Sequence, residues 1–195
     1  FEPSKRANSQ KVCTMINAAY QKRINKLMEE HQTANNAAIY FDMDGTITDL
    51  YNVPNWLDKL TSSNVTPYCE ALPIGNPEEL KSVLKMLKKC GYHLGIVSWC
   101  AKGGSKEYNQ ATRKAKKAWL DKYYPNIFEE IHIVKYGTPK HKTVSRSGIL
   151  IDDSQNVRKA WGARSIDATD FQNILKNLKI LLDFSTPNRN TVFTK

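Results

Sequence analysis

The sequence predicts an α/β fold in which a Rossmann-like parallel sheet carries helices on both faces. Short apolar runs alternate with longer segments whose apolar residues recur every three or four positions, a pattern typical of strand–helix–strand units. Several of the predicted strand ends also carry carboxylate or hydroxyl side chains. The length of 195 residues agrees with one domain at ~150 residues per domain.

Three parts are expected along the chain. Residues 1–36 form a helical extension, residues 37–184 form the α/β domain, and residues 185–195 form a polar tail. Within the extension, apolar residues fall on one helical stripe between Lys11 and Glu30. The predicted helix would dock on the domain or on a partner chain.

The first strand is predicted over residues 37–43, where an apolar run ends in two carboxylates. Asp42 and Asp44 lie two positions apart, so in strand geometry they leave the sheet on the same side. Ligands of open α/β sheets bind beyond such strand ends. Two carboxylates there repel each other unless a cation lies between them, and Mg²⁺ prefers oxygen ligands. An ordinary Asp–Gly turn is the alternative for this stretch.

Residues 47–77 are predicted to form a short flap, or small cap, over the strand ends. The segment is polar, contains several prolines, and is too short to bury a core of its own. One or two helical turns are expected near residues 56–60. Tyr51 and Trp56 could stack on a substrate base, although packing within the flap is the more common role of such residues.

The remaining elements alternate in order. Strands are predicted over 92–98, 131–134, 148–154 and 163–167, and helices over 77–90, 106–122, 155–161 and 171–184. The first of these helices is marked by Pro77 at its start and Gly91 just after its end. Besides Lys106 at its start, the second helix contains five cationic residues, for which a solvated face is the default expectation and a nucleic-acid track the alternative. These residues are Arg113, Lys114, Lys116, Lys117 and Lys122.

Charge and cysteine content narrow the function classes. Lys and Arg number 29 against 19 Asp and Glu, a net charge of +10, which favours anionic partners. The cysteines form no C-x-x-C pair and no zinc spacing, so free thiols in a reducing, cytoplasmic compartment are expected. No apolar run reaches the ~20 residues that span a bilayer, so no membrane association is expected. The cysteines are Cys13, Cys69, Cys90 and Cys100.

Four motifs follow in chain order: FDMDGT, GIVS, TPKHK and ILIDDS. They resemble the haloacid dehalogenase (HAD) superfamily of phosphohydrolases over roughly residues 37 to 170, with the short flap similar to that of small-cap, deoxyribonucleotidase-like members. That family has a first strand ending D-x-D-G-T and a second ending in Ser or Thr. A Lys precedes its fourth strand, which ends in paired acids. The resemblance implies a Rossmann-like sheet with the first strand at its centre.

The resemblance also implies a role for each strand end. Asp42 would be the nucleophile that becomes an aspartyl-phosphate, and Asp44 the general acid and base. Asp44 favours a phosphatase or a phosphomutase, because the ion-pumping ATPases of the superfamily have Thr at that position. Ser98 would bind a phosphoryl oxygen. Lys140 would neutralise the nucleophile and the phosphoryl group, with Lys142 as the open alternative.

The same resemblance implies a Mg²⁺ site, and substrate contacts are expected beside it. The metal ligands would be the Asp42 carboxylate, the Asp44 backbone carbonyl and Asp152, with Asp153 binding the metal either directly or through a bound water molecule. The expected substrate contacts are Thr46, Trp56 and Trp99.

The function expected from these motifs is Mg²⁺-dependent hydrolysis of a phosphate monoester, with a small nucleotide-like molecule as substrate. A phosphatase of nucleic-acid ends or of proteins is the alternative within the enzyme class. A different class stays open as well: a HAD-fold structural module that joins an assembly through the 11–30 helix. The complete set of acids favours the enzyme.

Overall fold

The computed structural model describes residues 37–185, which belong to one compact unit of the chain. The predicted helix over residues 11–30 and the tail beyond Ser185 lie outside the described residues.

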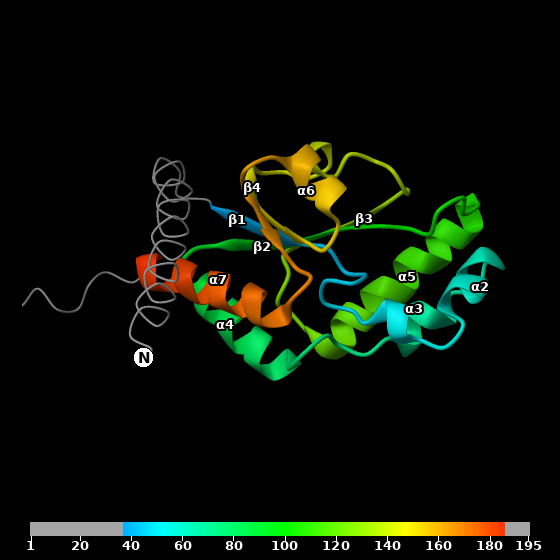
Figure 1. Ribbon diagram of the computed structural model, residues 1–195, viewed down its shortest axis with the longest axis horizontal. Helices are drawn as coiled ribbons and strands as arrows, with labels where there is room; N and C mark the ends of the chain where they lie inside the picture. Colours follow the sequence, from blue (N-terminus) through cyan, green and yellow to red (C-terminus); the bar gives the residue numbers. More distant parts are fainter. Residues whose placement is uncertain (1–36, 186–195) are drawn as a thin grey trace, which may run out of the picture. The chain divides into compact units, whose positions relative to one another are not determined.

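Five parallel strands form one sheet in the order β3-β2-β1-β4-β5, so the first strand is central (Figure 1). Phe41 pairs with Ile96 on one side and with Ile151 on the other, and the carboxyl ends of three neighbouring strands therefore lie close together. This arrangement confirms the predicted fold class. The strands are β1 (Ala38–Phe41), β2 (His93–Trp99), β3 (Glu130–Val134), β4 (Gly148–Asp152) and β5 (Ser165–Asp167).

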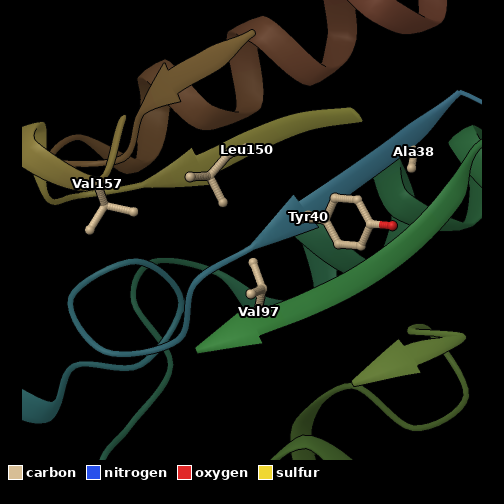
Figure 2. Close-up of a cluster of buried hydrophobic side chains, with 5 residues drawn as sticks. All are labelled: Ala38, Tyr40, Val97, Leu150 and Val157. Atoms are coloured by element: carbon tan, nitrogen blue, oxygen red, sulfur yellow. The ribbon is translucent and has the colours of Figure 1, made fainter. Parts of the chain in front are cut away.

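Helices cover both faces of the sheet (Figure 1). The helix α6 (Gln155–Trp161) packs on β4 and β5, whereas α4 (Pro77–Lys89) and α7 (Phe171–Ser185) lie side by side on the opposite face. The longest helix between residues 37 and 185, α5 (Lys106–Tyr123), connects β2 to β3. Figure 2 shows part of the core beneath α6, made of Ala38, Tyr40, Val97, Leu150 and Val157.

The first strand is shorter than predicted, because β1 ends at Phe41 and not at Met43. The backbone then turns around the Met43 carbonyl, which accepts hydrogen bonds from the amides of Thr46, Ile47 and Thr48. Gly45 has a φ of +75°, and a Cβ at this position would lie 2.6 Å from Asp153 Oδ2. A left-handed glycine is therefore required where the turn passes the end of β4.

The predicted flap contains more helix than expected. It consists of the 3₁₀ turn η1 (Leu50–Asn52) and the helices α2 (Trp56–Thr61) and α3 (Thr66–Glu70). The analysis of the sequence did not predict α3. This helix packs on α5, where Tyr68 joins a buried cluster with Leu50 and Ala115. Tertiary contacts with a distant helix thus stabilise a segment whose own sequence reads as polar loop.

Two expectations from composition concern the described part of the chain. Between residues 37 and 185, no helix has the length and apolar content needed to cross a bilayer. Cys69, Cys90 and Cys100 are free thiols, and Cys13 lies outside the described residues.

The carboxylate of Glu130, at the start of β3, connects β1, β2 and the loop that precedes β4. It accepts hydrogen bonds from the Ser145 amide and hydroxyl, at 2.8 and 2.7 Å, and from the Tyr40 hydroxyl at 3.0 Å. Nε2 of His93 lies 3.0 Å away, and His132 contacts the other oxygen. Burial opposes ionisation, but the hydrogen bonds from Ser145 and His132 outweigh it and lower the pKa of Glu130 to about 2.

We expect Glu130→Gln to lower the free energy of unfolding by about 1–3 kcal/mol near neutral pH, because an amide cannot accept all of these bonds. The folded pKa of Glu130 lies below the ordinary value of 4.5. Its contribution is therefore full above about pH 4.5 and is lost as the pH falls toward about 2. Urea unfolding of both proteins across this range measures the difference.

Glu70→Gln, at an exposed pair with Lys59, is the control and should change stability by less than about 0.5 kcal/mol. A difference between wild type and Glu130→Gln that stays constant as the pH falls would contradict the assignment.

Candidate active site

The ends of the three central strands bring four predicted site residues together. Asp42 directly follows β1, and its amide still donates to the Ile151 carbonyl of β4 at 2.9 Å. Ser98 is the penultimate residue of β2, and Asp152 is the last residue of β4. Lys140 reaches the same place from the 3₁₀ turn η2 (Lys140–Lys142), which precedes β4.

Lys140 is buried between two of the carboxylates. Its Nζ lies 2.9 Å from Asp42 Oδ2 and 2.7 Å from Asp152 Oδ2. Burial disfavours the ammonium form, but these two negative charges outweigh it and raise the pKa of Lys140. Lys142, two residues further along η2, is exposed. The structure thus places Lys140, and not Lys142, against the predicted nucleophile.

Asp42 has one oxygen engaged and one available. Its Oδ2 contacts Lys140, whereas Oδ1 is buried without a hydrogen-bond partner among the described residues. Burial opposes ionisation of this carboxyl, but the positive charges of Lys140 and Lys116 hold its pKa below the usual range. A buried carboxylate oxygen without a partner is costly unless a ligand completes it. This atom can therefore attack an electrophile or bind a cation.

The carboxylates fit a hard divalent cation. Single oxygens of Asp42, Asp152 and Asp153 lie within 4.8 Å of one another, and the ligands are all oxygen, as Mg²⁺ requires. Burial, followed by the negative charge of Asp42, raises the pKa of Asp152 and that of Asp153 to about 6. A bound cation would offset the repulsion between these negative charges and favour the ionised carboxylates.

Two residues behind the acids hold the loop after β4. The Arg158 guanidinium donates to the carbonyls of Asp152 and Asp153, at 2.7 and 2.6 Å. Thr46 is fully buried, and its hydroxyl accepts a hydrogen bond from the Asp153 amide at 3.2 Å. The Thr46 side chain thus positions Asp153 and is not among the residues that line the pocket, and its expected substrate contact stays a prediction. Nothing in the motifs indicated Arg158.

Asp44, the predicted acid and base, lies beside a buried cation that the analysis of the sequence missed. Nζ of Lys116, on α5, is 2.6 Å from Asp44 Oδ2 and 3.0 Å from Ser98 Oγ. Burial raises the pKa of Asp44, against the opposing charge of Lys116. A raised pKa suits a group that has to donate a proton near neutral pH.

The expectation of a solvated basic face on α5 is therefore wrong at one position. Lys114, Lys117 and Lys122 are exposed, but Lys116 is only 1% exposed. A signal was present in the sequence, since Lys116 lies three residues before Trp119 on the buried stripe of the helix. The prediction for this helix counted its charges and did not consider this periodicity.

A pocket of about 370 Å³ opens beside Asp42 and Asp44, between the flap and the loops after β2 and β3. Both predicted tryptophan contacts line it, and the rings form two pairs: Tyr51 with Trp56, 5.1 Å between centroids, and Trp99 with Tyr136, 5.0 Å. Lys102 is the cationic residue of its wall. The wall can enclose a flat apolar group next to the carboxylates.

Comparisons with known proteins find no matching family model and no matching curated protein. Several solved structures are similar to the chain. The D,D-heptose 1,7-bisphosphate phosphatase from Burkholderia thailandensis is 14% identical, with a TM-score of 0.42 over 66% of this chain and 73% of that one. A HAD-like phosphatase from Mesorhizobium loti is 11% identical, with a TM-score of 0.47 over 78% and 89%. Fcp1, an essential RNA polymerase II CTD phosphatase, is 16% identical, with a TM-score of 0.35 over 85% and 53%.

Each likeness is remote, and the function of this chain has to be argued from its own residues.

We expect Mg²⁺ to raise the melting temperature at about pH 8 and to have much less effect at about pH 5. The reason is that protons compete with the cation for Asp152 and Asp153, whose pKa values are about 6. Differential scanning calorimetry, with NaCl at matched ionic strength as the blank, measures the shift.

Asp153→Asn should lose most of the Mg²⁺-dependent shift, and Asp121→Asn, an exposed position on α5, should keep it. An equal shift at both pH values, or in both variants, would argue against a cation at these carboxylates.

Proposed function

We propose that the protein is a Mg²⁺-dependent phosphomonoesterase of the HAD type that works through an aspartyl-phosphate at Asp42. One observation carries the proposal: Lys140 fixes one oxygen of Asp42, and the other oxygen is buried and unpartnered beside two further acids. A carboxylate held in this way is prepared to attack phosphorus.

In the first half of the reaction, Asp42 Oδ1 attacks the phosphorus atom and the bond to the leaving oxygen breaks. Asp44, at the edge of the pocket, gives its proton to that oxygen. Lys140 and the Ser98 hydroxyl stabilise the charge that develops on the phosphoryl oxygens. When bound, Mg²⁺ would be held by Asp42, the Asp44 carbonyl, Asp152 and Asp153, and would neutralise the phosphoryl group.

In the second half, Asp44 is a carboxylate and accepts a proton from a water molecule. That water attacks the phosphorus atom of the aspartyl-phosphate, and the bond from phosphorus to Asp42 breaks. Inorganic phosphate leaves, Asp42 is again a carboxylate, and Asp44 is again protonated. The two aspartates that leave β1 two positions apart thus divide nucleophilic and proton-transfer chemistry between them.

The substrate is proposed to be a small nucleotide-like phosphate ester. The pocket beside Asp42 and Asp44 is lined largely by aromatic and aliphatic side chains, which suit a base better than a bare sugar. Its volume of about 370 Å³ lies toward the lower end of the range for small-molecule sites, as expected for a small substrate. Lys102, at the wall, can attract an additional negative charge.

A phosphorylated nucleic-acid end is the second candidate, because α5 also presents exposed lysines at positions 114, 117 and 122. Single strands bind to surfaces that combine basic tracks with aromatic platforms.

Asp42→Asn is expected to lower kcat for para-nitrophenyl phosphate by at least about 10³-fold, because the amide is a far weaker nucleophile. The change is nearly isosteric, so the melting temperature should stay close to that of wild type. Asp121→Asn serves as the matched control and should retain full activity. Near wild-type turnover by the Asp42 variant would exclude Asp42 as the nucleophile.

Chain length separates the two substrate candidates. We expect kcat/KM to be highest for a deoxymononucleotide and to fall for oligonucleotides that bear the same terminal phosphate. Trp56→Ala should raise KM for the mononucleotide roughly tenfold, since stacking on one aromatic ring contributes about 1–3 kcal/mol.

The two candidates also differ in their response to salt. A preference for oligonucleotides that weakens steeply with salt, and that is reduced by Lys117→Ala, would favour the nucleic-acid end instead.

A further inference from the structure

Lys116 is a buried cation that the proposed mechanism does not use. Its Nζ donates to Asp44 Oδ2 at 2.6 Å, to Ser98 Oγ at 3.0 Å and to the Trp99 carbonyl at 2.8 Å. An ammonium group has three donors, and these three acceptors use all of them. Lys116 therefore has no donor left for a substrate atom, and any effect on chemistry has to pass through its partners.

We propose that Lys116 is a positioning residue for phosphoryl transfer, which fixes the carboxylate of Asp44 and the hydroxyl of Ser98 relative to each other. The proposal rests on the proposed function. The two partners lie on different segments, the loop after β1 and the end of β2. Lys116 reaches both from α5, so one side chain joins three parts of the fold at the site.

The hydrogen bond to Ser98 also sets the direction of the serine hydroxyl. Since Ser98 Oγ accepts a hydrogen bond from Lys116, its own proton is directed toward another acceptor. Ser98 lies near the end of β2, next to the end of β1 that Asp42 follows. When a phosphoryl group is present there, the same proton can be donated to one of its oxygens.

The hydrogen bond from Lys116 to Asp44 likewise fixes the orientation of the proposed acid. Without Lys116, the remaining described side-chain contact of this carboxylate is a long one, 3.5 Å from Thr48 Oγ1 to Asp44 Oδ1. The Tyr68 ring, 4.9 Å from the Lys116 ammonium, encloses the pair from the side of the flap. An acid held by one weak contact would spend less time aligned with the leaving oxygen, and misalignment of reacting groups is costly.

A structural role alone is a weak explanation for this lysine. Buried ion pairs are often replaced by apolar residues of similar volume without loss of stability, and position 116 lies on the apolar stripe of α5. A methionine would fill the same space. If Lys116 is a positioning residue, removal of its charge should lower the rate of the step that uses Asp44.

The experiment compares two esters that differ in their need for an acid. An aryl phosphate such as para-nitrophenyl phosphate has a good leaving group, whereas an alkyl phosphate needs its leaving oxygen protonated. We expect Lys116→Met to lower the ratio of kcat on the alkyl ester to kcat on the aryl ester by about 10- to 100-fold. Lys85→Met, at an exposed position on α4, should leave the ratio unchanged.

A double variant keeps the test valid if removal of one charge of the buried pair impairs folding. Asp44→Asn with Lys116→Met is a neutral pair of similar size. Its alkyl-to-aryl ratio should equal that of Asp44→Asn alone, because the lysine acts through the aspartate. Equal losses on both esters, or a further fall in the double variant, would overturn the positioning role. A wild-type protein inactive on every phosphate ester would instead refute the proposed function and this inference with it.

Discussion

Burial of Lys140 between Asp42 and Asp152 is the interaction on which the rest of the site depends. A parallel sheet brings the ends of neighbouring strands together, and here that geometry gathers carboxylates from β1 and β4 in a place with little access to water. Their mutual repulsion and desolvation would oppose folding without a compensating charge. Lys140 supplies it from η2, at 2.9 and 2.7 Å. The same contact leaves the second oxygen of Asp42 free for chemistry.

Charge balance extends beyond this single pair. The Lys116 ammonium neutralises Asp44 from α5, and Arg158 holds the backbone of the two acids after β4. A divalent cation would complete the balance at Asp152 and Asp153. The flap then has a specific part in the architecture. It packs on α5 through Tyr68 and so closes the aromatic pocket next to the charges, where a leaving group can lie.

The sheet and its acids could be predicted from the sequence because both depend on local patterns. Apolar runs gave the strands, and the carboxylates at their ends gave the place of the site. The spacing of Lys140 and Lys142 could not decide between them, because the η2 turn determines which one enters the core. Lys116 was misjudged because a count of charges on a helix ignores which face is buried. The helix α3 depends on contacts with α5, which no local pattern contains.

The central claim is that Asp42 becomes covalently phosphorylated, and intact-protein and peptide mass spectrometry can test it directly. Asp44→Asn removes the base proposed for the second step and should let the intermediate accumulate. After this variant is mixed with Mg²⁺ and para-nitrophenyl phosphate and quenched in acid, we predict one phosphoryl group on the peptide that contains Asp42. Its loss on treatment with hydroxylamine would identify an acyl phosphate. A phosphoryl group on a different residue, or substrate turnover without any phosphorylated protein, would contradict the account.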